Sequence, residues 1–474
     1  MRSPAWNLRA VLALSMFGVV GAAGEEAAPK VDTAKDGEPA IGELVIVPQT
    51  PAPAPAPAPK TEMISLADLR AAAEAGDAAS QFGMGNCYIQ GLGLAVDPTQ
   101  AFAWYERAAK QGYAPAMAAL GTMYGAGRGV TLDYAQARHW LEAAADKLGA
   151  ADQSAVGMLY LKDGVLGAVD LAAAARWFEK AAQGGDANAM SHLGTQYLRG
   201  EGVPKDLEKA LRWLRPAAEH GMLLAESNLG WMYMQGVGVE KDYAEALKWI
   251  RPAAEKGFVG AEVHLGLMYE LGHGVTMDKA AARTWYQKAA DAGDAYGMNN
   301  LGNCYLGGIG GPKDYAVARR WLEPAATGGN AVAQRNMGRI YLNGLGVPID
   351  QQVAVMWFRL SADQGDASGI YNLARCYKAG LGVAKDAAAA TPLFEKAAAL
   401  GDVTAVAVVG RMYLKADGVD KDLKKALEFS QRAADQGNAY AQETLAMMYH
   451  DGEGVPKDSR KSTEWMTKAK APRN

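Results

Sequence analysis

Eleven aspartates recur along the chain at an almost constant interval, and carboxylates in such number could bind metal ions or act as general acids and bases. They are Asp97, Asp133, Asp170, Asp206, Asp242, Asp278, Asp314, Asp350, Asp386, Asp422 and Asp458. Each follows a glycine-rich turn and begins a helical pattern, where an aspartate side chain accepts hydrogen bonds from free backbone N–H groups. We interpret these carboxylates as helix N-caps, and expect neither a metal nor a catalytic site from them.

The other residues with reactive side chains also fail to form a constellation. The six histidines, at 139, 192, 220, 264, 273 and 450, match no metal-ligand spacing, and no nucleophile elbow or phosphate-binding loop is present. Cys87, Cys304 and Cys376 each precede a tyrosine, in a slot that other repeats fill with Met, Leu or Ile. Such a slot predicts three free, buried thiols. We therefore expect a protein without a cofactor and without enzymatic chemistry.

Arginines offer a binding chemistry instead. Arg339, Arg375 and Arg411 occupy one position in three successive repeats, two residues before a tyrosine, and Arg335 lies one helical turn before Arg339. Arginine makes strong charge-assisted hydrogen bonds, so this ladder could clamp a carboxylate, an acidic peptide or an anionic glycan. Amides stand nearby, at Asn299, Asn300, Asn303, Asn336 and Asn372. The alternative is a solvated ridge of arginines paired with Asp or Glu on neighbouring helices.

Trp231 holds the same position in an earlier repeat. An exposed tryptophan there would anchor a partner, whereas local curvature could instead bury it. His192 and His264 stand five residues before a tyrosine, where other repeats carry asparagine. We interpret these two histidines as substitutes for a recurrent amide.

The elements that position these residues follow from a ruler of eleven tyrosines. Ten consecutive steps separate them, all of 36 residues except one of 37: Tyr88, Tyr124, Tyr160, Tyr197, Tyr233, Tyr269, Tyr305, Tyr341, Tyr377, Tyr413 and Tyr449. Such a period predicts a stack of identical helical hairpins, which usually presents an extended binding surface. Before each tyrosine, apolar residues at helical spacing indicate a first helix. Glycine stands three before it in nine of eleven repeats, which predicts that another helix packs too closely for a side chain.

A second helix follows the aspartate and carries a recurrent tryptophan, then Ala-Ala, and ends at glycine. We expect the tryptophans to form core between repeats. Leu-Gly-x-x-Tyr, Gly-x-Gly-Val-x-x-Asp and Ala-x-x-Trp-x-x-x-Ala-Ala-x-x-Gly together resemble the Sel-one-like repeat, an α/α solenoid family related to tetratricopeptide repeats. The resemblance covers about residues 65–470. It implies an all-α, right-handed superhelical solenoid of about 11 helix–turn–helix repeats of 36 residues.

Function is implied by the same resemblance. Family members act as adaptors and scaffolds, and in related solenoids the position of the arginine ladder lines a concave groove. The candidate binding residues there are Arg335, Asn336, Arg339, Asn372, Arg375, Arg411, Trp231 and Asn303. We expect a protein or peptide partner, and the arginine ladder favours an acidic one. Some secreted relatives bind or hydrolyse β-lactams, but they carry a disulfide in each repeat, which this chain lacks. A surface adhesin for a host protein or glycan is the other alternative.

The N-terminal residues and the composition predict where the protein is located and which partners it lacks. Residues 1–23 have basic residues, an apolar stretch and then Gly-Ala-Ala, typical of a signal peptide. Residues 24–61 are rich in Pro and Ala and predict a disordered linker, which leaves 62–474 for the solenoid, with a cap helix at about 65–75 and repeats over about 76–470. The net charge of −4 includes no long charged run, so neither nucleic acid nor a membrane surface is expected. We expect an exported protein, periplasmic or secreted, without a membrane span after cleavage.

Overall fold

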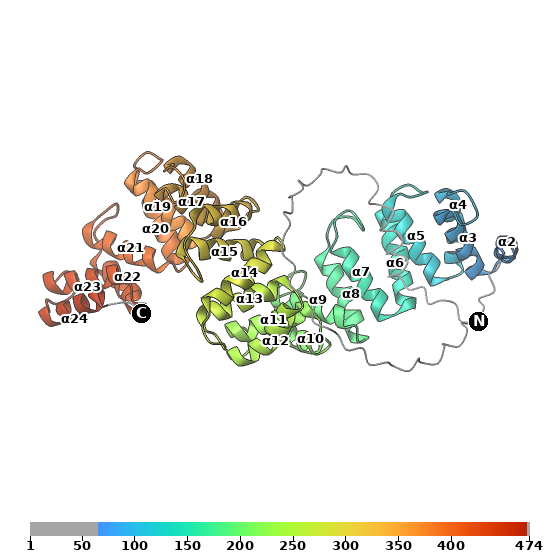
Figure 1. Cartoon of the computed structure of the whole chain (residues 1–474), viewed down its shortest axis with the longest axis horizontal. Helices are drawn as coiled ribbons and strands as arrows, with labels where there is room; N and C mark the ends of the chain where they lie inside the picture. Colours follow the sequence, from blue (N-terminus) through green and yellow to red (C-terminus); the bar gives the residue numbers. More distant parts are fainter. Residues whose placement is uncertain (1–64, 472–474) are drawn as a thin grey trace, which may run out of the picture. The chain divides into compact units, whose positions relative to one another are not determined.

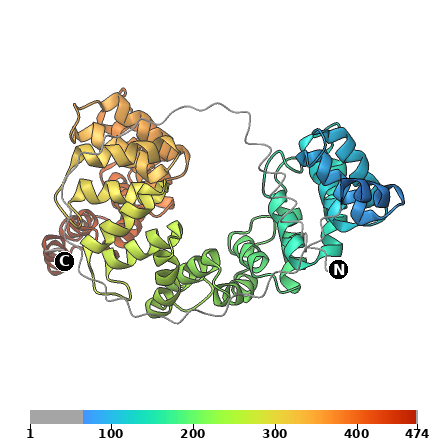
Figure 2. The same ribbon diagram turned by 45° about the vertical axis from the view of Figure 1, so that its right-hand side comes forward.

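The computed structural model describes residues 65–471, and every regular element in that range is an α-helix. The predicted signal peptide and the Pro/Ala-rich segment lie outside the described residues. By internal contacts the chain divides into two compact units, Met1–Ala225 and Glu226–Asn474. Figures 1 and 2 show that the helices of each unit lie side by side in the order of the sequence.

The described helices of unit 1 begin with α2, whose N-cap Ser65 accepts a hydrogen bond from the Asp68 backbone N–H. They are α2 (Leu66–Glu74), α3 (Ala78–Gln90), α4 (Pro98–Lys110), α5 (Ala114–Ala126), α6 (Tyr134–Leu148), α7 (Ala150–Tyr160), α8 (Leu171–Gln183), α9 (Ala187–Arg199) and α10 (Leu207–Glu219). Helix α11 (Leu223–Gln235) begins in this unit and continues into the next.

Unit 2 continues the same alternation. Its further helices are α12 (Tyr243–Glu255), α13 (Val259–Leu271), α14 (Lys279–Asp291), α15 (Ala295–Gly307), α16 (Tyr315–Thr327), α17 (Ala331–Asn343), α18 (Gln351–Asp363), α19 (Ala367–Ala379), α20 (Ala387–Ala399), α21 (Val403–Lys415), α22 (Leu423–Asp435), α23 (Ala439–Asp451) and α24 (Ser459–Lys470). From α3 onward, odd-numbered helices are the first and even-numbered helices the second of each repeat. Within both units, each first helix other than α11 contacts its own second helix and the helix before it.

The recurrent aspartates cap the second helices, as predicted. Asp278 is typical, because one of its carboxylate oxygens accepts from the backbone N–H groups of Ala280 and Ala281 at 3.0 and 2.9 Å. All eleven aspartates make such a contact. These carboxylates are therefore used in defining where the helices begin.

The recurrent glycine marks close packing of the two helices in one repeat. A Cβ atom added to Gly302 would stand 2.5 Å from Leu322 Cγ, and one added to Gly338 would stand 2.5 Å from Phe358 Cε1. The predicted close approach is thus confirmed. Leu322 and Phe358 each directly follow a recurrent tryptophan in the sequence and are fully buried.

The tryptophans match the prediction in part, because they pack against core clusters but only Trp104 of the nine is buried. Trp321 packs against a buried cluster that includes Tyr286 of the preceding repeat, so it lies between repeats as expected. It is only half-buried, however. The central core position belongs to the next residue, because its side chain points at the glycine while the tryptophan lies about 100° further round the helix.

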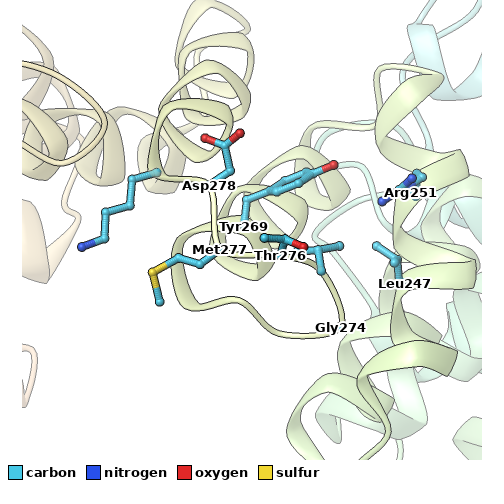
Figure 3. A pocket seen from close by; sticks show the side chains of 9 residues that line it. Leu247, Arg251, Tyr269, Gly274, Thr276, Met277 and Asp278 are labelled. Atoms are coloured by element: carbon cyan, nitrogen blue, oxygen red, sulfur yellow. The ribbon is translucent and has the colours of Figure 1, made fainter. Parts of the chain in front are cut away.

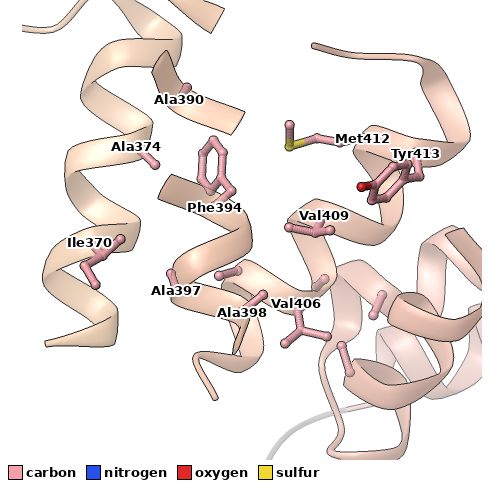
Figure 4. Close-up of a cluster of buried hydrophobic side chains, with 14 of the residues drawn as sticks. Ile370, Ala374, Ala390, Phe394, Ala397, Ala398, Val406, Val409, Met412 and Tyr413 are labelled. Carbon is pink, nitrogen blue, oxygen red and sulfur yellow. The ribbon is translucent and has the colours of Figure 1, made fainter. Parts of the chain in front are cut away.

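The core of unit 2 includes several clusters of buried side chains between first and second helices. Figure 4 shows its C-terminal part, where Phe394 of α20 lies beside Ala374 of α19 and Met412 of α21 follows. Cys87, Cys304 and Cys376 are buried and free, as predicted. Between residues 65 and 471, none of the helices has both the length and the apolar character needed to cross a bilayer.

Candidate functional site

The predicted binding residues lie on first helices, most of them on α15, α17, α19 and α21. Trp231 is on α11 and Asn303 on α15, Arg335, Asn336 and Arg339 are on α17, Asn372 and Arg375 are on α19, and Arg411 is on α21. Helix α17 contacts both α15 and α19, and α21 contacts α23. The helix order therefore brings Asn303, the three residues of α17 and the two of α19 together, and Trp231 belongs to a more distant repeat.

Arg339 and Arg375 are the two exposed arginines of the ladder. Each guanidinium donates to the asparagine one turn earlier: Arg339 Nη1 to Asn336 Oδ1 at 3.3 Å, and Arg375 Nη1 to Asn372 Oδ1 at 3.5 Å. No carboxylate of the described residues forms an ion pair with either arginine. Two positive charges therefore stand at the same register on neighbouring helices without an internal counter-charge.

The amides beside them are largely used inside the protein. Asn336 is only 1% exposed. Its Nδ2 donates to Asn303 Oδ1 at 2.9 Å and to Asn299 Oδ1 at 3.2 Å. This network links α15 to α17 and leaves Asn336 Oδ1 free to accept from Arg339. Asn336 and Asn303 therefore position the arginine, and Asn372 holds Arg375 in the same way while its own Nδ2 donates to the Ser368 carbonyl at 2.8 Å.

Arg335 matches the alternative of a paired arginine. Its Nη1 donates to both carboxylate oxygens of Asp366, at 2.9 and 3.0 Å. The two side chains are 22% and 14% exposed, so this ion pair is partly shielded from water. Asp366 is also the N-cap of α19 and accepts from the Gly369 backbone N–H. Arg335 therefore connects two repeats and is not free for a ligand.

Arg411 is half-buried and engaged with the last repeat. Its guanidinium stands 3.9 Å from the centroid of the Tyr440 ring, and Nη2 lies 3.3 Å from Met447 Sδ and 3.9 Å from Glu443 Oε2. Its Nε atom is buried without a hydrogen-bond partner among the described residues. The ladder of three arginines is thus two open positions followed by one that is partly neutralised.

Aromatic side chains on the same face were not among the sequence predictions. Tyr371 packs edge-on against Phe394, with ring centroids 5.8 Å apart, and the Arg375 guanidinium lies 5.9 Å from its centroid. Desolvation by burial raises the pKa of the Tyr371 hydroxyl, while Arg375 acts in the opposite direction. Tyr296 and Tyr440 are 66% and 39% exposed. Both stand nine residues before a repeat tyrosine, where most repeats carry a small or aliphatic residue, and that departure was the available signal.

The two histidines behave as substitutes for the recurrent amide. His264 Nδ1 lies 3.5 Å from Ser227 Oγ of the preceding first helix, in the same relation that Asn336 has to Asn299. Desolvation lowers the pKa of His264 to about 4 and also lowers that of His192, which stacks on Phe178. No group of three or more potential metal ligands occurs within residues 65–471.

Trp231 is half-buried, which is intermediate between the exposed anchor and the buried side chain that the sequence left open.

Comparisons with known proteins agree with this geometry. The family model described as Sel1 repeat matches eleven segments: 78–113, 114–147, 150–186, 187–222, 223–258, 259–294, 295–330, 331–366, 367–402, 404–438 and 439–471. No curated protein matches the chain.

Two solved structures are similar at substantial identity. One is a protective antigen present in uropathogenic Escherichia coli strains and displaying an SLR fold; it is 36% identical, with 86% of this chain and 87% of that chain covered and a TM-score of 0.63. The other is a Sel1 repeat protein from Oxalobacter formigenes, 35% identical, with 65% and 89% covered and a TM-score of 0.53. With eleven matched repeats from residue 78 to residue 471, the chain belongs to the Sel1 repeat family.

Proposed function

We propose that this protein is an exported scaffold that binds an acidic segment of a partner protein across the first helices α17 and α19, and that it carries out no chemistry of its own. Proteins built from Sel1 repeats are protein-interaction scaffolds. The observation that carries the proposal is the pair Arg339 and Arg375, exposed at one register without a carboxylate partner among the described residues.

The spacing of the two arginines selects a kind of partner. Packed neighbouring helices lie about 8–10 Å apart. A peptide in the polyproline II conformation advances about 3.1 Å per residue and completes one turn in three residues. Two acidic side chains three residues apart in such a segment lie on the same face, at about the separation of the two guanidinium groups. Tyr371, next to Arg375, offers an aromatic surface to the backbone between those side chains. Arg335 and Arg411 would lie at the edges of such a site, and Asn303, Asn336 and Asn372 would support it, whereas Trp231 on α11 lies outside it.

A peptide-binding experiment tests the proposal. A fluorescent peptide containing Glu-x-x-Glu should bind, and its Gln-x-x-Gln analogue should bind at least tenfold more weakly, as should the acidic peptide to the double variant R339E/R375E. The matched control is R320E/K396E, which makes the same change of charge at two exposed residues of second helices. Equal loss of peptide affinity in both double variants would show that net charge alone causes the effect, and would refute a site on α17 and α19.

The exported location is a separate part of the proposal. It rests on the sequence of residues 1–23, and the relative described as a protective antigen favours it. That relative also favours a second candidate function, binding of a host molecule at the cell surface. Fusing residues 1–61 to a reporter that is active only outside the cytoplasm tests export, and digestion of intact cells with a protease distinguishes a surface location from a periplasmic one. An inactive reporter would refute export.

A further inference from the structure

Each repeat tyrosine has a charged or polar residue 18 positions earlier, on the preceding helix. At the first, third, ninth and tenth repeats a hydrogen bond joins the two side chains directly. Arg70 and Arg359 donate to the hydroxyls of Tyr88 and Tyr377 at 3.0 and 3.1 Å, and the hydroxyls of Tyr160 and Tyr413 donate to Glu142 and Glu395 at 2.5 and 2.6 Å. The charge on the second helix is therefore satisfied inside the protein at these repeats.

The corresponding pair in the sixth repeat is open. Arg251 of α12 stands 18 residues before Tyr269 of α13, but no hydrogen bond joins them, and no described residue forms an ion pair with Arg251. An open pocket of about 760 Å³ lies there instead, between α12 and the loop that precedes α14. Figure 3 shows the Tyr269 hydroxyl directed toward the side of the pocket where Arg251 and Leu247 stand.

Two other repeats carry a hollow at this place, and they serve as internal comparisons. The ninth repeat has one of about 350 Å³ beside Arg359, which is bonded to Tyr377. The tenth has one of about 680 Å³ beside Tyr413, whose hydroxyl is bonded to Glu395 and lies 3.3 Å from Lys425 Nζ. The hollow thus recurs, but only the sixth of these three leaves both an arginine and a phenol hydroxyl without an internal partner.

The lining of this pocket defines the chemistry that it could accept. Arg251 offers paired N–H donors and a positive charge, and the Tyr269 hydroxyl offers a further donor. Leu247, Val275 and Met277 supply apolar wall, and the Met277 side chain is 56% exposed. A guanidinium and a donor hydroxyl in one pocket suit a carboxylate, and the apolar wall suits a hydrocarbon body attached to it. Asp278 also lines the pocket, but its carboxylate is engaged as the N-cap of α14.

We propose that this pocket is a binding site for an organic carboxylate with a hydrophobic body, held by Arg251 and Tyr269 and separate from the arginine pair on α17 and α19. The carboxylate is carried either by a free small molecule or by an acidic side chain of a partner. The site is independent of the proposed function, since it uses a different element pair and a different face of the repeat.

Methyl NMR of the full chain tests the site, with the Met277 signal assigned by comparison with M277L. Benzoate should shift that signal in a saturable manner, while benzyl alcohol (no charge) and acetate (no hydrophobic body) should bind at least tenfold more weakly. A short peptide with one glutamate next to leucine distinguishes the two sources: binding tighter than that of benzoate assigns the site to a partner's side chain, and weaker binding assigns it to a free molecule.

Two substitutions complete the test. R251Q should weaken benzoate binding at least tenfold and Y269F by a smaller factor, whereas R359Q, in the closed pair of the ninth repeat, should leave it unchanged. Melting curves of the three variants establish that each is folded. The absence of a saturable shift in the unmodified protein, equal affinity for benzyl alcohol, or unchanged affinity in R251Q would each overturn the proposal.

Discussion

Replacing Glu262 by glutamine is predicted to stabilise unit 2. Glu262 stands seven residues before a repeat tyrosine, and Gln81, Gln334 and Gln442 hold the same slot in other repeats. Each of these glutamines is buried and donates Nε2 to the carbonyl eight residues earlier, at 3.0 to 3.2 Å. Glu262 is 6% exposed and, when ionised, has no proton to donate to the equivalent carbonyl at the end of α12.

The size of the effect follows from that missing hydrogen bond. A buried hydrogen bond contributes about 1 kcal/mol, and in a unit of this size such a gain raises the melting temperature by about 2–4 °C. Desolvation raises the pKa of Glu262, and the nearby Lys288 acts in the opposite direction. The pKa of Glu262 in the folded protein therefore lies above its value in the unfolded chain. Below the unfolded-state pKa, Glu262 is protonated and no buried charge lowers the stability of the wild-type protein. As the pH rises through the folded-state pKa, the carboxylate ionises and that stability is lost.

The assay is thermal unfolding of wild type and E262Q at pH 8 and at pH 4, with E226Q as the matched control. Glu226 holds the same slot, but Lys256 lies 3.5 Å from it, 30 residues later. Two of the glutamines also have a polar partner 30 residues later, since Gln111 donates to Gln81 and Gln364 donates to Gln334. The residue 30 positions after Glu262 is Ala292, which has no polar side chain. E262Q should therefore be stabilising at pH 8 and much less so at pH 4, and E226Q should give no gain. A gain for E262Q that is equal at both pH values would refute the argument.

Four further substitutions test the packing and the helix caps. S430A should stabilise the tenth repeat by about 1 kcal/mol in urea unfolding, since Ser430 Oγ is buried without a partner among the described residues; S361A should have the opposite effect, because Ser361 Oγ donates to Asp366. G302A should cost about 1–3 kcal/mol in the same assay, because the new methyl group would overlap Leu322, and a neutral result would show that the two helices can separate. D350A should cost about 1 kcal/mol through loss of the N-cap of α18, and hydrogen exchange should be faster in its first turn.

The sequence was sufficient for those features that depend on one repeat alone. The N-cap aspartates, the close approach at Gly302 and the buried cysteines each follow from local helix geometry, and all were predicted correctly. The tryptophans were predicted as core because they are large and recurrent, yet Leu322 and Phe358 hold the central position. Those residues vary in type from repeat to repeat, so their slot is less visible in the sequence although it is more buried.

Features that depend on two repeats could not be assigned in the same way. Arg335 and Arg339 look equivalent in sequence, four residues apart on one helix face. Asp366 pairs with the first because the N-cap of the next first helix stands beside it, whereas no carboxylate between residues 65 and 471 forms an ion pair with the second. Distinguishing them requires the lateral position of neighbouring helices, which a repeat period gives only in part.

Two properties decide whether a residue that departs from the repeat pattern can act as a binding residue. One is whether a neighbouring group compensates its charge, and the other is whether its side chain is exposed. Arg335 and Glu226 depart from register but meet a compensating charge, Arg335 at the start of the next repeat and Glu226 at the end of its own, so they are used in structure. Glu262 departs without such compensation in a buried slot, and an uncompensated buried charge lowers the stability of the protein. Arg339 and Arg375 are also uncompensated, but they are exposed, and water solvates their charge in the free protein. An exposed, unpaired arginine of this kind costs the fold little stability and keeps its N–H donors available. Those are the conditions that a binding residue has to meet.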